Sequence, residues 1–192
     1  MLKATHQDKP RVTDILARSF DRNQSVNYII PQDTTRDQRI KALMSYSFDV
    51  CHAFGEVFLS DDRRACALAV LPEKKKTNVM SIFRDVGLIF SCTGLGNVRK
   101  ALRREGLIKK IQPKESMYYL WFIGVDPDYQ GQGRGSRLLN EVIGRSSELQ
   151  RPVYLETSTP ENLPWYEDFG FRIYSDLDLG YKLYFLKRES EE

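Results

Sequence analysis

The residues of this chain with the clearest chemical potential are three glycines at alternate positions, Gly131, Gly133 and Gly135. They follow an apolar stretch that ends at Val125, and they precede a segment with helical periodicity. Glycines at a helix entry leave several backbone N–H groups uncovered, with the positive end of the helix dipole behind them. The sequence therefore predicts a site for a phosphate or pyrophosphate group at this turn.

Two familiar phosphate loops describe this turn poorly. The sequence contains no Gly-Lys-Ser/Thr, which excludes the mononucleotide P-loop. A dinucleotide fingerprint should open the first strand–helix unit, whereas this turn lies well into the second half of the chain. Glu156 could supply the acid which that fingerprint needs on the next strand, so a dinucleotide site stays an alternative, as does a tight turn without a ligand.

A strand–helix–strand unit is expected to hold the turn in place. Residues 118–125 are apolar at both parities, which is typical of a central strand covered on both faces. A helix packed on the sheet should follow, because apolar residues recur with its period from Leu138 to Leu149. Residues 152–157 read as the next strand, and this spacing predicts that the two strands run parallel. A short helix is expected over 164–169.

The rest of the chain reads as alternating helices and short strands without a repeat or a linker. Helices are expected over residues 10–22, 34–52 and 77–111, the last broken near 93–96. Strands are expected over residues 2–6, 56–60, 64–71, 171–174 and 182–187. Residues 25–31 are expected to form a loop. The length favours one domain over residues 1–192.

Two segments resemble the motifs of a known family. Gln130-x-x-Gly133-x-Gly135 resembles the Gln/Arg-x-x-Gly-x-Gly/Ala signature of the GNAT (Gcn5-related N-acetyltransferase) superfamily. The segment from Leu155 to Phe171 is similar to a second family motif, in particular that of puromycin N-acetyltransferase-like members. Two motifs in the right order are more specific than either alone. The resemblance covers roughly residues 118–187, and residues 1–116 match only in element order.

The resemblance implies an α/β fold of the GNAT type. Its central sheet is mixed and mostly antiparallel, with helices on both faces. A parallel β-α-β core that binds acetyl-CoA is splayed into a V-shaped cleft. Gly124 is a natural site for the bulge that opens such a cleft. Residues 77–111 then read as a helical insertion on the substrate side.

The resemblance assigns acetyl-CoA to the glycine turn. The pyrophosphate would be held by the backbone amides of Gln130, Gly131, Gln132, Gly133, Arg134, Gly135 and Ser136. Arg134 and Arg137 either help to bind the phosphates or are exposed arginines without a ligand. The strand would offer backbone groups to the pantetheine arm at Ile123, Gly124 and Val125. The Val125 N–H would polarise the acetyl carbonyl.

The resemblance also implies roles for Asn162 and Tyr166, which share one face if the segment is helical. Asn162 would fix the coenzyme arm, and the alternative is a plain helix N-cap. Tyr166 would protonate the departing thiolate, and the alternative is a core aromatic. Some relatives place a general-base glutamate where this chain has Tyr119. Glu156 is the remaining candidate base, unless it is a structural or solvent-facing carboxylate; a water chain or an already neutral amine would also serve.

The implied function is an N-acetyltransferase that transfers acetyl from acetyl-CoA directly to a primary amine. A small amine, such as an antibiotic, a polyamine or an amino-acid derivative, is favoured over a protein by analogy of fold. Several residues could line the acceptor pocket or belong to the core: Phe20, Tyr28, Tyr46, Met80, Phe83, Phe90 and Trp121. Because the expected glutamate is missing, a non-catalytic acyl-CoA sensor is the second hypothesis.

Composition and charge speak against other classes. The net charge of +3 is too small to argue for nucleic acid. One helix face is basic, with Arg99, Lys100, Arg103, Arg104, Lys109 and Lys110. We expect this face to be solvated, and the third hypothesis is that it binds nucleic acid or an anionic surface. The apolar run of residues 79–92 is too short for a membrane span, and no secretory signal is seen, so we expect a cytoplasmic protein. Three cysteines and two histidines predict neither disulfides nor a metal site. A monomer and a homodimer remain equally compatible with the sequence.

Overall fold

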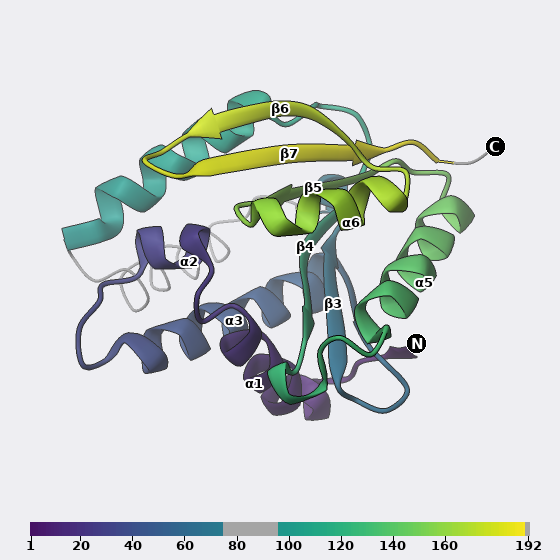
Figure 1. The fold of residues 1–192 in the computed structure, drawn as a ribbon, viewed down its shortest axis with the longest axis horizontal. Coiled ribbons are helices and arrows are strands. Elements are labelled where there is room, and N and C mark those ends of the chain that lie inside the picture. Colours follow the sequence, from purple (N-terminus) through teal and green to yellow (C-terminus); the bar gives the residue numbers. More distant parts are fainter. Residues whose placement is uncertain (75–95, 191–192) are drawn as a thin grey trace.

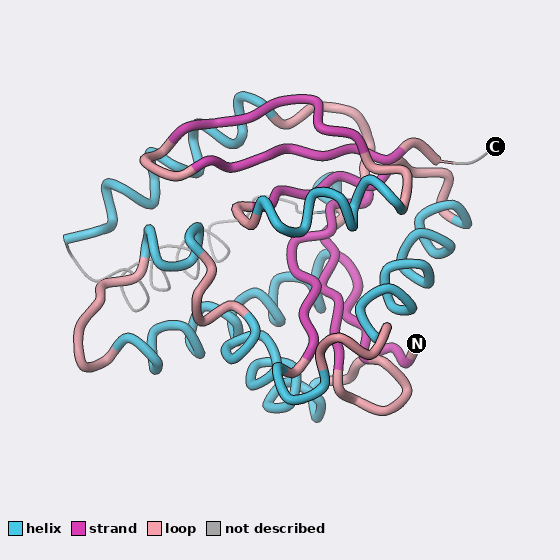
Figure 2. Tube along the Cα trace, viewed as in Figure 1, coloured by secondary structure: helices cyan, strands magenta, loops and turns pink. Residues whose placement is uncertain are grey.

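The computed structural model describes residues 1–74 and 96–190. Seven described strands form one sheet in the order β1-β2-β3-β4-β5-β7-β6 (Figures 1 and 2). The strands are β1 (Leu2–Lys3), β2 (Gly55–Leu59), β3 (Ala65–Val70), β4 (Tyr118–Val125), β5 (Val153–Thr157), β6 (Arg172–Asp178) and β7 (Lys182–Arg188). The main helices are α1 (Lys9–Ser19), α2 (Gln24–Ile29), α3 (Arg36–Phe54), α5 (Arg134–Glu148) and α6 (Leu163–Asp168). A further helix covers residues 96–111.

The sheet opens between its two central strands. β4 and β5 are parallel, and the other neighbouring strands are antiparallel. Pairing of β4 with β5 covers only Tyr118 with Val153 and Tyr119 with Tyr154. Beyond that point the strands diverge, and β3 and β4 run in a clearly different direction from β5, β6 and β7 (Figure 1). This confirms the expected mixed, splayed α/β fold and its parallel β-α-β core.

Helices cover both faces of the sheet because each carries one apolar stripe. Helices α1 and α3 bury Ile15, Leu16 and Phe48 against one face. Helix α5 buries Leu139 and Val142 against the other face, together with α6. Strand β3 is buried throughout, as expected for a strand in the middle of the sheet. Along β4, buried residues alternate with partly buried ones, so one face of β4 is less completely covered than the sequence predicted. Among the described residues, none of the helices has the length and apolar character needed to span a bilayer.

Two expectations about local structure were wrong. Residues 24–29 form the helix α2 rather than a loop, because the Asn23 side chain accepts a hydrogen bond from the Val26 N–H at 3.0 Å and caps the helix. The bulge in β4 lies at Trp121, since Leu68 pairs with Phe122 while Ala69 pairs with Leu120. It does not lie at Gly124.

Gly124 has a different role, which is close packing. A Cβ built on Gly124 would lie 2.5 Å from the Ser19 Oγ and 3.1 Å from the Leu16 Cδ2. The glycine therefore lets α1 rest directly on the end of β4.

The helix over residues 96–111 packs on the β6–β7 hairpin and runs behind β6 in Figure 1. Ile108 joins Leu183 and Phe185 in a small apolar cluster. Leu102, although apolar, is 54% exposed. The buried and partly buried stripe is instead Ala101, Arg104, Ile108 and Ile111, with the spacing of one helix face. The expected helical residues 77–95 lie outside the described residues.

Candidate functional site

The glycine turn leads into an α5 N-terminus with free backbone donors. Gly131 and Gly133 have φ values of 71° and 74°, a conformation that glycine adopts without strain. The first helical hydrogen bond runs from the Arg137 N–H to the Gly133 carbonyl at 3.0 Å. The amides of residues 134–136 therefore lack a carbonyl partner within the helix, and Gly133 offers no side chain to cap them. This geometry suits a phosphate group.

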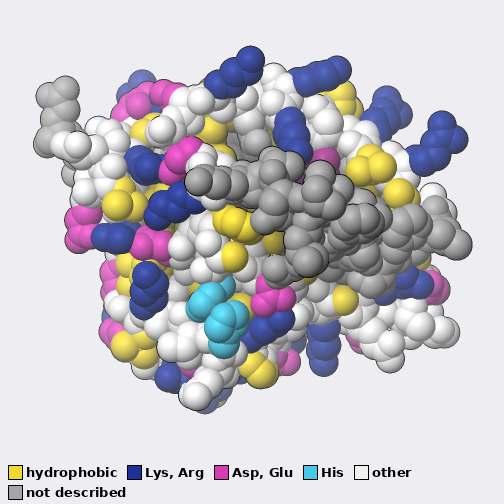
Figure 3. Space-filling view, turned by 180° about the vertical axis from the view of Figure 1, so that it is seen from behind, with side chains coloured by type: hydrophobic (Ala, Val, Ile, Leu, Met, Phe, Trp, Pro, Cys, Tyr) yellow, Lys and Arg dark blue, Asp and Glu magenta, His cyan; other side chains and the backbone are white. Residues whose placement is uncertain are grey.

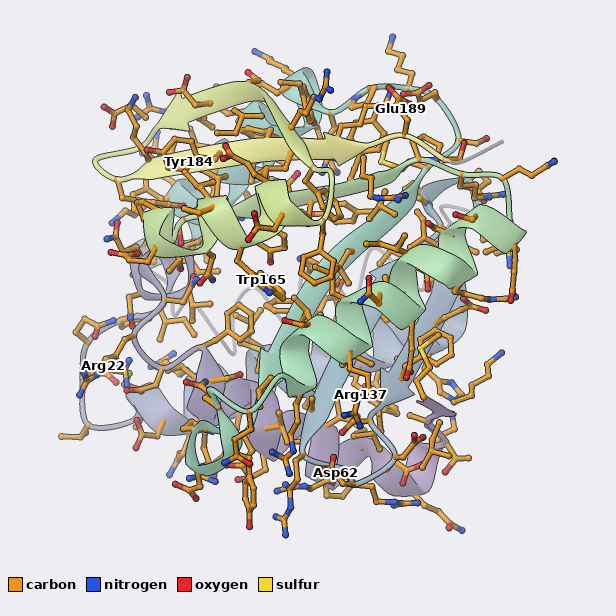
Figure 4. All side chains as sticks on the ribbon, turned by 45° about the vertical axis from the view of Figure 1, so that its right-hand side comes forward. Arg22, Asp62, Arg137, Trp165, Tyr184 and Glu189 are labelled. Atoms are coloured by element: carbon orange, nitrogen blue, oxygen red, sulfur yellow. The ribbon has the colours of Figure 1, made fainter. Side chains whose placement is uncertain are left out.

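The Arg134 side chain, next to the turn, already forms hydrogen bonds and an ion pair with neighbouring residues. Arg134 donates to Asp62 at 2.6 Å and to Gln132 at 2.5 Å. Hydrogen bonds from Ser60 and Arg134 hold the pKa of Asp62 at about 2, so this ion pair persists at neutral pH. Arg134 thus already has an acidic partner. Arg137 is exposed on the outer side of α5 (Figure 4).

The open edge of β4 carries the Val125 amide. The Asp126 N–H donates to the Arg64 carbonyl at 2.8 Å, on the β3 side. Because successive N–H groups of a strand point to opposite sides, the Val125 N–H points toward β5. The β4–β5 pairing has ended by then, at Tyr119 and Tyr154. The Val125 carbonyl, on the same side, accepts a hydrogen bond from the Gln130 side chain at 3.2 Å. The Val125 amide therefore faces the cleft.

A cavity of about 1080 Å³ fills this cleft. Its walls come from the glycine turn, the diverging strands β4 and β5, α6, α2 and the helix over 96–111. It brings together most of the predicted site residues: Ile123, Gly124, Val125, Gln130, Gly131, Gly133, Arg134, Gly135, Ser136, Glu156, Asn162 and Tyr166. Gln132 and Arg137 are not among its lining residues.

Tyr166 faces this cavity from α6. Its ring is buried among Trp165 and Phe171, and its hydroxyl has no hydrogen-bond partner among the described residues. Burial raises the pKa of the Tyr166 phenol, so it keeps its proton at neutral pH. Trp165 reaches from α6 toward the first turn of α5, where its Nε1 donates to the Ser136 Oγ at 3.0 Å (Figure 4). Asn162 is exposed, and its side chain makes no capping hydrogen bond to α6.

Glu156 is held by two donors inside the cavity. The Gln112 Nε2 donates to one carboxylate oxygen at 2.8 Å, and the Tyr119 hydroxyl donates to the other. Burial raises the pKa of Glu156, and the hydrogen bonds from Tyr119 and Gln112 offset only part of that rise. Tyr119, which replaces the glutamate of some relatives, thus contacts a carboxylate from the adjacent strand. Sequence reasoning missed Gln112, because it follows the end of a helix and belongs to no motif.

The remaining predicted pocket residues lie in the cavity wall, beside the helix over residues 96–111, or outside the described residues. Phe20, Tyr46 and Trp121 line the cavity. Tyr28 packs on the Tyr181 ring and under the Lys100 ammonium instead. Met80, Phe83 and Phe90 lie outside the described residues.

The face drawn in Figure 3 carries charges of both signs. On this face, Lys and Arg side chains are interspersed with Asp and Glu. Arg99, Arg103 and Lys110 are exposed on the helix over 96–111, as expected for a solvated face. Arg104 departs from this pattern, because its side chain is only 15% exposed and lines the cavity. Within residues 1–74 and 96–190, no three His, Cys, Asp or Glu side chains come together as a metal site would require.

Known proteins share both the motif region and the fold. Residues 94–173 match the acetyltransferase (GNAT) domain family. An uncharacterized N-acetyltransferase of Schizosaccharomyces pombe is 37% identical over 54 residues, which is 28% of this chain and only 22% of that relative's length.

Solved structures extend the likeness to the whole chain. A structure described as histone acetyltransferase HPA2 and related acetyltransferase, from Corynebacterium glutamicum, has a TM-score of 0.70 at 19% identity, covering 100% of this chain and 96% of that one. Arylalkylamine N-acetyltransferase 2 from Aedes aegypti has a TM-score of 0.63 at 12% identity, covering 99% and 98%. At these identities the structures show the fold alone. The narrower likeness to puromycin N-acetyltransferase-like members stays a prediction. Residues 94–173 thus match the GNAT acetyltransferase domain family, and the whole chain shares its fold with solved acetyltransferase structures.

Proposed function

We propose that this protein transfers the acetyl group of acetyl-CoA to the primary amine of a small molecule. The observation that carries the proposal is one cavity shared by the uncapped α5 N-terminus, the open edge of β4 and the Glu156 carboxylate. The match of residues 94–173 to the GNAT acetyltransferase domain family supports acetyl transfer. A small acceptor is favoured because Glu156 lies partly buried behind Tyr119 and Gln112, where a protein surface has poor access.

The coenzyme would lie along the turn and the open strand edge. In this proposal the amides of residues 130–136 bind the pyrophosphate, and Ile123, Gly124 and Val125 offer backbone groups to the pantetheine arm. Asn162 supports that arm; it lines the cavity and does not cap α6, which favours this role over the N-cap alternative. Arg134 would have to loosen its contact with Asp62 to reach a phosphate.

The chemistry then needs three groups. Glu156 accepts a proton from the amine, whose nitrogen attacks the acetyl carbonyl carbon. The Val125 N–H stabilises the negative charge that develops on the carbonyl oxygen. As the carbon–sulfur bond breaks, the Tyr166 hydroxyl donates its proton to the departing thiolate. The products are the acetamide and the free thiol of coenzyme A.

Calorimetric titration with acetyl-CoA, followed by a screen of primary amines for thiol release, tests the proposal. We expect micromolar binding and amine-dependent thiol release. The variant Tyr166→Phe should keep its affinity for acetyl-CoA and lose about 10²-fold or more in turnover, since it lacks the proton donor. Tyr174→Phe is the matched control, because Tyr174 is 39% exposed on β6 and does not line the cavity. Binding without turnover of any amine would favour the sensor hypothesis, and absence of binding would refute both.

A further inference from the structure

Arg104 is a cation placed on the inward face of its helix. It lies in line with Ala101 and Ile108, whereas its neighbour Arg103 is exposed. Its side chain, 15% exposed, lines the same cavity as Glu156. An arginine in an otherwise apolar stripe is costly unless its charge is used, because a guanidinium loses its hydration on burial.

Three segments of the chain fix the Arg104 guanidinium. Its Nε donates to the Tyr181 hydroxyl at 3.2 Å, and one terminal nitrogen donates to the Ser25 Oγ at 2.5 Å. The other terminal nitrogen donates to Glu105 at 2.7 Å. These contacts join α2, the helix over 96–111 and the β6–β7 turn, so the side chain is held in one orientation.

The guanidinium retains binding capacity in this arrangement. It has five N–H groups, and three contacts leave two without a partner among the described residues. Its carboxylate partner, Glu105, is 54% exposed, so that ion pair is screened by water. Free N–H groups on a fixed guanidinium match the two oxygens of a carboxylate.

The Arg104 guanidinium, with its unpaired N–H groups, lies in the same cavity as Glu156, the proposed base for the amine. The positive charge of Arg104 acts on Glu156, where it opposes the effect of burial on the carboxyl pKa. Arg22 and Lys109 add positive charge to the cavity lining, against the carboxylates of Glu105 and Glu156. A second cationic group on the acceptor, as in a polyamine, would therefore be repelled.

We infer that the acceptor carries a carboxylate besides its amine, as an amino acid or amino-acid derivative does, and that Arg104 binds this carboxylate. The inference rests on the proposed function. The amine then lies toward Glu156 and the anionic group lies toward Arg104, within one cavity. Apolar walls at Phe20 and Trp121 would accept an apolar side chain.

Matched pairs of acceptors test this inference. Phenylalanine is compared with phenethylamine, leucine with 3-methylbutylamine, and 6-aminohexanoate with pentylamine, each by thiol release at saturating acetyl-CoA. In the wild type we expect at least one carboxylate-bearing member to have a kcat/KM about tenfold or more above its partner, as a charge-assisted pair implies. Arg104→Gln should remove that preference. Because Arg104 also acts on Glu156, a change in the value for the plain amine would be shared by its carboxylate-bearing partner, so the ratio of kcat/KM within each pair is the readout. Arg103→Gln, an exposed neighbour, should leave both values unchanged.

Several outcomes would overturn the inference. A wild type that prefers the plain amine in every pair contradicts it, as does acetyl-CoA binding without turnover of any carboxylate-bearing member. An equal loss for both members in Arg104→Gln would make Arg104 a structural tie only. The melting temperature and the acetyl-CoA affinity of that variant are measured alongside. If it does not fold, the wild-type pairs and Arg104→Lys, which keeps the charge but not the fork, decide the question. Failure of the wild type to bind acetyl-CoA would instead refute the proposed function.

Discussion

Glu156 shows how the surroundings of one side chain prepare it for proton transfer. An ordinary glutamate, with a pKa of about 4.3, is a weak base toward an amine. Burial raises the pKa of Glu156 and makes it a stronger base, while hydrogen bonds from Tyr119 and Gln112 stabilise its ionised form. The two effects oppose each other, so the pH at which Glu156 becomes active depends on its donors.

Replacing Gln112 should therefore move the pH dependence of the reaction. Gln112→Leu removes a donor that lowers the pKa of Glu156, so that pKa should rise further. Because only ionised Glu156 acts as the base, the rising limb of kcat/KM against pH should shift to higher pH. Tyr119→Phe should shift it in the same direction.

The exposed residue Gln38 of α3 provides a matched control, Gln38→Leu. That variant should reproduce the wild-type profile. An unshifted limb in Gln112→Leu, with a lower maximum only, would mean that Gln112 does not control the ionisation of Glu156.

Among the helices and strands, α5 matters most for the proposed function, because the turn before it is the proposed phosphate site. The turn before it needs positive φ at Gly131 and Gly133, and a Cβ built on either meets no atom within 4 Å. The space is open because the ligand, in our proposal, approaches the backbone there.

Gly133→Ala should lower the affinity for acetyl-CoA about tenfold or more, because its methyl group would occupy the path of the phosphate. Strain at the positive φ should cost about 1 kcal/mol of folding free energy as well. Calorimetric titration and thermal unfolding measure the two effects separately.

Gly180→Ala is the control for strain. Gly180 has a φ of 86° and open space around its Cβ position, but it lies in the β6–β7 turn and does not line the cavity. This variant should lose similar stability and no affinity. Equal affinity in both variants would show that the glycine turn does not bind the coenzyme.

For the molecule as a whole, a charge cluster joins segments that are far apart in the sequence. Asp126, buried at the end of β4, accepts from Arg18 at 2.6 Å and from Arg11 at 2.9 Å, both on α1. Arg18 also pairs with Asp128 at 2.7 Å. These ion pairs hold α1 against the loop that connects β4 to the glycine turn.

Asp126→Asn should destabilise the fold by about 2 kcal/mol, less than a fully buried pair would cost, because both arginines are partly solvated. Burial alone would raise the pKa of Asp126, but bonds from Arg11 and the Asp128 amide and the charge of Arg18 outweigh it, and the pKa is lowered. The stabilisation is therefore present above the unfolded-state pKa of about 4 and is lost as the pH falls below it.

Urea unfolding at pH 7 and at about pH 3 measures this contribution, since the difference between wild type and Asp126→Asn should shrink at the lower pH. Asp14→Asn serves for comparison, because Asp14 is 44% exposed and its ion pair with Arg11 is longer, at 3.5 Å. A difference that is constant with pH would contradict the assigned role of the Asp126 charge.

Local chemistry made much of the fold and part of the site predictable. The glycine turn, the apolar β4 and the parallel unit around α5 depend on backbone freedom and on hydrophobic periodicity, which neighbouring residues carry. Helix α2 was missed, because a six-residue helix with one Asn cap carries little periodic signal. The bulge at Trp121 was misplaced to Gly124, because a register is set between two strands.

By itself, the amino-acid sequence determined which residues could bind a phosphate and which strands could surround them. It did not determine which side chains donate hydrogen bonds to Glu156, because Gln112 follows a helix end and Tyr119 lies on the adjacent strand. It also left open the direction of Arg104, since one row of basic residues can face water or a cavity until the hairpin and α2 lie against the helix. Such contacts join residues distant in the chain, and the free energy that selects them exists only once the elements have packed.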